Sequence, residues 1–172
     1  MARWSTLLML AAFASVSLGG LRAIADIYDA FPAWGWRWIE AVDPITDEAK
    51  WAAKLTAIGA DAEVSLQCVG GRAGILFMWG NRVATKKNWE IEYRFEGQRG
   101  HSLNAEWINS RHLAAMEPAE VQTFFSEAKV SKKLYVRVTS HAYGVSDASF
   151  LTGGSEAMAS RFRAVCPVVT GK

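Results

Sequence analysis

The chain has 172 residues, 19 of them basic and 17 acidic, and a formal net charge of +2. Arg3 and Arg22 lie in the first 25 residues, a segment without acidic residues, so the remaining chain carries 17 basic and 17 acidic residues. A neutral chain lacks the excess positive charge that binding to nucleic acids or anionic membranes uses, which argues against both as partners.

The first 25 residues have the three-part layout of a secretory signal peptide. Arg3 precedes an apolar stretch over 6–21, and Ala23 and Ala25 form a small-residue site that would be cut after Ala25. An uncleaved membrane anchor is the alternative, but serines and glycines interrupt the stretch, and no later run is long enough to span a bilayer. We predict a signal peptide over 1–25, one β-rich domain over 26–172, and a periplasmic or secreted protein.

Close to the mature N-terminus lies "WGWRWIE" (34–40), in which tryptophans alternate with other residues. The alternation predicts a strand with Trp34, Trp36 and Trp38 on one side. Trp34 and Trp36 lie close to the mature N-terminus, so we expect them to be partly exposed and to form part of a contact surface.

The next segment, 46–59, fits two structures. Thr46 could cap a helix that ends near Gly59 and buries Trp51, Leu55 and Ile58. The same residues also alternate like those of an edge strand. Local signals favour the helix.

Three alternating or apolar runs then predict strands. The first places Val64, Leu66 and Cys68 on one side, and the second is the apolar run 75–79. Between them, "GGRAG" has the composition of a turn, so we expect these two strands to form a hairpin. The third run, 89–95, places its aromatic residues and Ile91 inward and its charged residues in water.

The C-terminal half predicts two helices around a second hairpin. A helix over 118–129 begins with a proline and should bury Val121, Phe124, Phe125 and Ala128. The runs 133–139 and 147–152 alternate and are separated by a turn. A final helix over 155–166 follows two glycines and stops before Pro167. Together these elements predict a mainly β protein: an antiparallel, sandwich-like domain with two short helices, bordering on α+β.

Cys68 and Cys166 are the two cysteines of the chain. Export to an oxidising compartment favours a disulfide between them, whereas two free buried thiols are the alternative. Cys68 lies on the inward side of its strand and Cys166 on the inward stripe of the last helix, at i+4 from Phe162. We therefore predict that a disulfide joins the last helix to the sheet.

The residues that could carry out catalysis or bind a metal, which are the histidines and the paired carboxylates, predict neither catalysis nor a cofactor. His101, His112 and His141 are expected in turns or loops, and no pair of them has the spacing of metal ligands. Glu90 and Glu92 could act as paired carboxylates, but they alternate on a solvated strand face, where cross-strand pairing explains them. We predict no catalytic residue, no metal and no cofactor.

The turn "SHAYGVS", 140–146, offers the remaining surface feature. We add His141 and Tyr143 to the expected contact surface, because a protruding loop that carries His or Ser is what an enzyme inhibitor would present. The partner is expected to be a protein or another component of the cell envelope.

The order of several short motifs resembles a known family. These motifs are "DPITDE" (43–48), "LQC" (66–68), "FMWG" (77–80), "YRF" (93–95), Trp107 to Ser110, "VRV" (136–138), "ASF" with "GGSEA", and Cys166. The order resembles the periplasmic proteins associated with type VI secretion, of the VasI or TagO kind. The resemblance spans about 38–166 and implies an exported, disulfide-closed, β-rich accessory or binding protein without known catalysis. It also implies extended structure for 46–59.

Two kinds of function follow from these expectations. The first is a non-catalytic accessory or binding domain of the cell envelope, which the resemblance connects with secretion machinery. The alternative is an inhibitor of a cell-wall hydrolase or a small exported hydrolase, which a small disulfide-closed β domain could also be.

Overall fold

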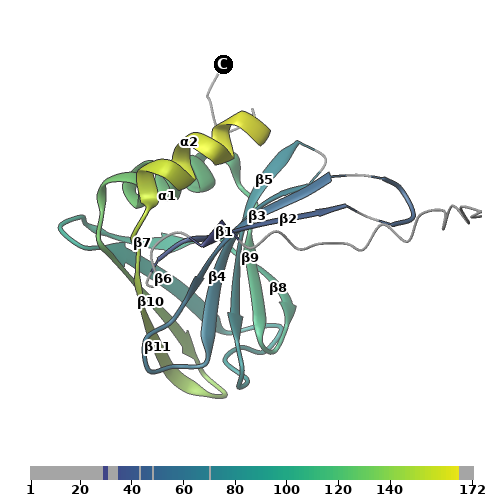
Figure 1. The fold of residues 1–172 in the computed structure, drawn as a ribbon. Helices are drawn as coiled ribbons and strands as arrows, with labels where there is room; N and C mark the ends of the chain where they lie inside the picture. Colours follow the sequence, from purple (N-terminus) through teal and green to yellow (C-terminus); the bar gives the residue numbers. More distant parts are fainter. Residues whose placement is uncertain (1–28, 31–34, 43, 48, 70, 167–172) are drawn as a thin grey trace, which may run out of the picture.

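The computed structural model describes residues 29–30, 35–42, 44–47, 49–69 and 71–166. The predicted signal peptide, 1–25, lies outside these residues, as does Trp34. The described part of the chain forms two antiparallel sheets and two helices (Figure 1). The mainly β, sandwich-like fold with two helices is confirmed.

The larger sheet has seven strands in the order β1-β2-β3-β4-β5-β9-β8. Its strands are β1 (Asp29–Ala30), β2 (Arg37–Val42), β3 (Ala49–Thr56), β4 (Ala62–Val69), β5 (Arg72–Trp79), β8 (Glu106–Asn109) and β9 (His112–Ala115). The hairpin predicted around "GGRAG" is the pair β4 and β5, in which Val69 lies opposite Arg72. The second strand therefore begins earlier than the sequence indicated.

The smaller sheet has four strands in the order β11-β10-β6-β7. It consists of β6 (Trp89–Phe95), β7 (Gly100–Leu103), β10 (Lys133–Ser140) and β11 (Gly144–Leu151). In β6 and β10 buried and exposed side chains alternate, as predicted. One face of this sheet therefore joins the core, and the other carries charged and polar side chains into solvent.

The helix α1 (Pro118–Val130) closes one end of the space between the sheets (Figure 1). It buries the four residues that its sequence indicated, which are Val121, Phe124, Phe125 and Ala128. The ring of Phe124 contacts Phe77 of the larger sheet and Tyr93 and Phe95 of the smaller sheet, at centroid distances of 5.0–6.3 Å. A single side chain thus links both sheets to the helix.

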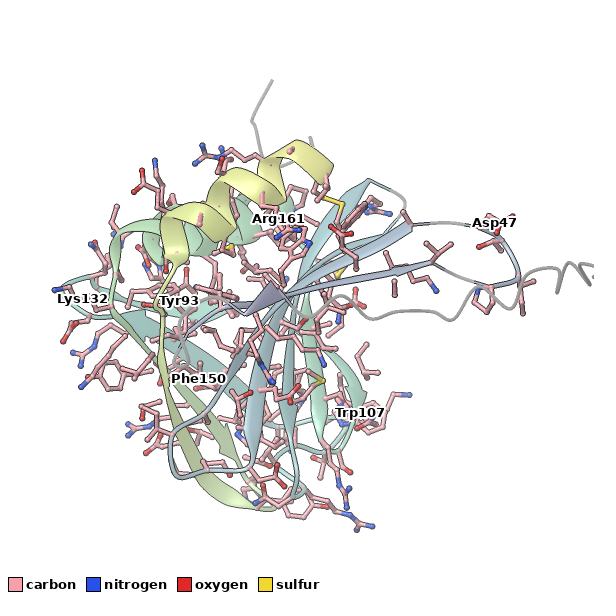
Figure 2. All side chains as sticks on the ribbon, viewed as in Figure 1. Asp47, Tyr93, Trp107, Lys132, Phe150 and Arg161 are labelled. Carbon is pink, nitrogen blue, oxygen red and sulfur yellow. A yellow bond between two sulfur atoms is a disulfide. The ribbon has the colours of Figure 1, made fainter. Side chains whose placement is uncertain are left out.

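The helix α2 (Ser155–Val165) lies beside α1 and is held to the larger sheet by both aromatic and covalent contacts. Phe162 packs edge-on against Trp38 at 6.3 Å. The guanidinium of Arg161 lies over the same indole at 5.1 Å (Figure 2). Cys166, which caps the helix, forms the predicted disulfide with Cys68.

The structure decides between the two predictions for 46–59. Residues 49–56 are strand β3, which is paired with β2 on one side and with β4 on the other. The helix that local signals favoured is wrong, and the extended structure implied by the resemblance is correct. Hydrogen bonds to two neighbouring strands outweigh the helix propensity of the alanines and lysines.

Trp36 is fully buried, so the expectation that it is partly exposed is wrong. Its backbone N–H donates to the carbonyl oxygen of Gly153 over 3.0 Å, and its indole N–H donates to Ser155 Oγ over 3.2 Å. These two bonds place the indole under the start of α2. Trp36 is therefore a core residue and forms no part of a contact surface.

Candidate functional site

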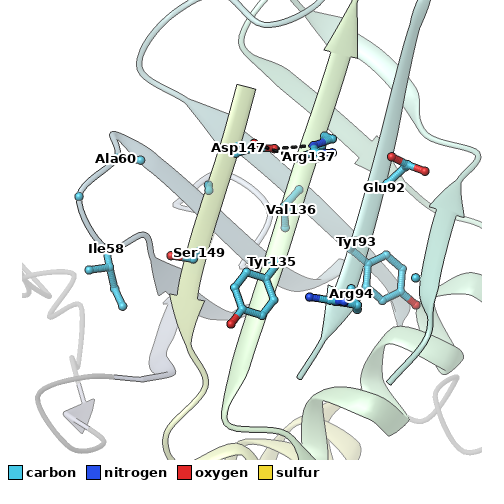
Figure 3. A pocket seen from close by; sticks show the side chains of 13 residues that line it. Ile58, Ala60, Glu92, Tyr93, Arg94, Tyr135, Val136, Arg137, Asp147 and Ser149 are labelled. Atoms are coloured by element: carbon cyan, nitrogen blue, oxygen red, sulfur yellow. Dashed lines mark hydrogen bonds and ion pairs between the residues drawn. The ribbon is translucent and has the colours of Figure 1, made fainter. Parts of the chain in front are cut away.

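A groove of about 670 Å³ crosses the outer face of the four-stranded sheet (Figure 3). It is lined by side chains from β6, β10 and β11 and by the loop that joins β3 to β4. Pockets of a few hundred cubic ångströms are the usual size for ligand sites. The groove is therefore large enough to hold a ligand or a segment of a partner.

The strand register explains why these side chains lie together. Arg137 in β10 lies directly opposite Asp147 in β11 and Glu92 in β6. Two residues before Arg137 in β10, Tyr135 lies opposite Ser149 of β11 and Arg94 of β6. Because alternate residues of a strand share one face, two parallel rows of side chains run across the sheet.

The first row is ionic. Arg137 donates from Nε to Asp147 Oδ1 over 2.7 Å and from Nη2 to Asp147 Oδ2 over 3.0 Å. The hydrogen bonds from Arg137, together with its positive charge, hold the pKa of the Asp147 carboxyl below its ordinary value. This two-point pairing fixes the orientation of both planar groups at the groove floor.

The second row is aromatic. The Arg94 guanidinium carbon lies 5.4 Å from the centroid of the Tyr135 ring, within the range of a cation–π contact. Tyr135 is 36% exposed. Its neighbour on the other side of the row, Ser149, has a short side chain.

The loop between β3 and β4 forms one end of the groove. The N–H of Ile58 donates to the carbonyl oxygen of Ser149 over 2.8 Å, which ties the loop to the edge of β11. The side chain of Ile58 is 48% exposed. Gly59 lies at this end and Gly100 at the other, and a Cβ at either glycine would meet no atom within 4 Å.

A second hollow, of about 880 Å³, lies where the end of α1 meets the start of α2. The residues that line it are mostly small or aliphatic, with Lys129, Lys132 and Glu156 at the surface, and they include no aromatic side chain. It offers fewer groups that could orient a ligand than the groove does.

A titratable cluster lies on the inner side of β7. His101 Nε2 is 2.7 Å from Glu127 Oε1 of α1, and its ring stacks on Tyr93 at 5.0 Å. Burial, followed by the charges of Glu127 and Glu120, raises the pKa of the Tyr93 hydroxyl. The cluster is nearly closed to solvent, and we interpret it as an attachment of α1 to the small sheet.

The three histidines differ from the prediction in their local structure. His101 lies in β7 and His112 in β9, and only His141 lies in a turn, so the expectation of loops for the first two is wrong. His112 Nδ1 is 2.8 Å from Asn109 Oδ1. Among the described residues no group of three potential metal ligands lies close enough to hold an ion.

Of the predicted contact surface, His141 and Tyr143 are exposed. They occupy the short turn between β10 and β11, on the same hairpin as the groove, but neither lines it. The residues that do line it, such as Tyr135 and Arg137, belong to the alternating run 133–139, which was predicted as a strand without being recognised as part of a site. Their outward alternation on neighbouring strands was the signal that could have identified them.

No protein-family model, curated protein or solved structure matches this chain. In the described part of the chain, neither helix has the length and apolar character needed to cross a membrane.

Proposed function

We propose that this chain is an exported, non-catalytic binding domain of the cell envelope, and that it binds its partner through the groove on the four-stranded sheet. The observation that carries the proposal is the pair of rows described above, which presents the partly exposed Tyr135 beside Arg94 and Arg137, the second of them paired with Asp147. Tyrosine and arginine are the residues that most often carry binding energy at protein surfaces.

The disulfide supports the exported location. Disulfides persist in oxidising compartments such as the periplasm and are rare in the cytosol. The predicted signal peptide over 1–25 points to the same compartment. A connection with type VI secretion is part of the proposal and rests on the order of short motifs in the sequence.

The absence of catalysis is proposed from the state of the charged groups. In the groove, the Asp147 carboxylate is held ionised by Arg137, and a lowered pKa disfavours its use as a general acid near neutral pH. Glu92 lies on the other side of the same arginine. Asp147 is thus placed to be held by a cation rather than to exchange protons with a substrate.

The hydrolase inhibitor is a second candidate, which one observation favours. The hairpin of β2 and β3 projects from the body of the molecule, with Asp47 near its tip (Figure 2). Ile45 in this hairpin is 91% exposed and Val42 is 50% exposed. Such a projection could enter the cleft of an enzyme, a role that the sequence also suggested for the turn at 140–146.

The experiment that tests the proposal is fractionation of cells that express the full chain. We expect the protein in the periplasmic or secreted fraction, oxidised, and partly retained on washed envelopes. Tyr135→Ala should reduce retention, whereas Ile108→Ala, which truncates a half-exposed side chain in β8 of the other sheet, should not. A reduced cytoplasmic protein, or equal retention of both variants, would contradict the proposal.

A further inference from the structure

We infer that the groove on the four-stranded sheet binds a linear, electrically neutral glycan. This inference rests on the proposed function, because it names the class of ligand for the same surface. The direction, the charge and the side-chain chemistry of the groove support it.

The direction of the groove fits a chain-like ligand. Its lining begins at the loop 58–60, crosses β11, β10 and β6, and ends at Gly100 in β7. Adjacent strands lie about 4.8 Å apart, so the groove spans roughly 14 Å across the sheet. The glycine at each end adds no side chain that would block a longer chain. A polymer could therefore enter at one end and leave at the other.

The charge of the groove selects against ionic polymers. The charged side chains in its lining are Arg94, Arg137, Glu92 and Asp147, whose formal charges sum to zero. Asp147 and Glu92 lie on opposite sides of Arg137, which leaves no continuous strip of positive charge. Polyanions such as nucleic acids need such a strip, whereas a neutral chain does not.

The common modes of peptide recognition fit this surface poorly. An added β-strand pairs with a sheet edge, but this groove crosses the strands at their faces. An amphipathic helix needs an apolar groove, and proline-rich segments need a groove lined by several aromatic rings. Here Tyr135 is the one exposed aromatic side chain among the lining residues, and charged groups surround it.

The chemistry of the lining matches sugar rings. A pyranose presents an apolar C–H face, which can pack against the exposed part of the Tyr135 ring, next to the short side chain of Ser149. It also presents hydroxyl groups at its edge, which both donate and accept hydrogen bonds. The fixed Arg137–Asp147 pair supplies donors and acceptors side by side in one plane.

The test is a binding measurement on protein purified from the exported fraction of cells that express the full chain. The probes are neutral oligosaccharides of glucose, N-acetylglucosamine, mannose and galactose, with an acidic oligogalacturonate and a synthetic peptide library as comparisons. We expect a neutral oligosaccharide to bind, with affinity that rises with chain length and changes little with salt.

Two variants test the location of binding. Tyr135→Ala should weaken the affinity at least tenfold, and Ser149→Tyr, which fills the space beside the ring while keeping Tyr135, should do the same. Ile108→Ala, which truncates a half-exposed side chain in β8 of the other sheet, should change the affinity less than twofold. If each variant unfolds at the same midpoint temperature as the wild type, a loss of binding is not a loss of the fold.

Binding of the acidic oligosaccharide alone, binding of peptides alone, or no binding of any neutral sugar would overturn the glycan inference. Neutral-sugar binding that survives both Tyr135→Ala and Ser149→Tyr would overturn its location. If the sugars fail while the groove still captures a protein, the proposed binding function stands and only the glycan is wrong.

Discussion

Cys68 in β4 and Cys166 at the end of α2 are joined by a disulfide across a Cα–Cα distance of 5.8 Å and a sequence separation of 98 residues. The bond closes a loop that contains the whole of the smaller sheet and strands β5, β8 and β9 of the larger one. It also holds the last helix against the strand that lies at the centre of the larger sheet.

Replacing Cys68 with Ser should therefore destabilise the whole fold, and not only the last helix. We expect a loss of about 2–5 kcal/mol in the free energy of unfolding, the range for native disulfides in small secreted domains. Unfolding in urea measures this loss of free energy. The double variant Cys68→Ser/Cys166→Ser should lose about as much as the single one, because either change removes the same bond. Unchanged stability after reduction of the wild type would contradict this account.

Phe124 should be a second point of sensitivity, because its ring contacts both sheets. Phe124→Ala should lower the free energy of unfolding by about 3–5 kcal/mol, through lost burial and the cavity that remains. Val130→Ala on the same helix is the matched control. Val130 is 69% exposed, so we expect a change within about 0.5 kcal/mol. Equal effects of the two substitutions would show that α1 does not close the core as described.

The close approach of Gly35 to Gly153 yields a third prediction. A Cβ at Gly35 would lie 2.3 Å from the carbonyl oxygen of Gly153, which accepts the hydrogen bond from Trp36. Gly35→Ala should therefore cost about 1–3 kcal/mol by forcing the two backbones apart. Gly100→Ala, where a Cβ meets no atom within 4 Å, should cost less than about 1 kcal/mol. Thermal unfolding of the two variants checks the difference.

The titration of Asp147 tests the ionic row of the groove. The pKa of this carboxyl lies below the ordinary value of about 3.9, because Arg137 stabilises its ionised form. A folded-state pKa below the unfolded one stabilises the fold above the unfolded pKa, and this contribution disappears as the pH falls through the folded value. Carbon NMR of the carboxyl should show the low midpoint in the wild type and a return toward the ordinary value in Arg137→Gln. An ordinary midpoint in both proteins would contradict the pairing.

Much of the fold could be predicted because its signals are local and periodic. Alternation in 89–95 and 133–139 identified β6, β10 and their buried sides, and Pro118 with its apolar stripe identified α1. The segment 46–59 could not be assigned from local propensity. Its structure depends on pairing with β2 and β4. These strands lie outside the segment, so its own residues carry no signal of the pairing.

The groove escaped prediction for a similar reason. Tyr135 and Arg94 are 41 positions apart in the sequence, and only the register of β10 with β6 brings the guanidinium onto the ring. Trp36 was misplaced because a position near the predicted mature N-terminus indicated exposure, whereas its hydrogen bonds to Gly153 and Ser155 bury it. Both errors concern contacts between distant parts of the chain.

The central claim, that the outer face of the four-stranded sheet is the binding surface, is tested most directly by photo-crosslinking in cells. A benzophenone amino acid at position 135 would probe the groove. The same group at position 108, where Ile108 is 51% exposed in β8 of the other sheet, is the matched control. We predict a crosslinked product, to a glycan or to a protein, at position 135 and none at position 108. Crosslinking at 108 without crosslinking at 135 would contradict the claim.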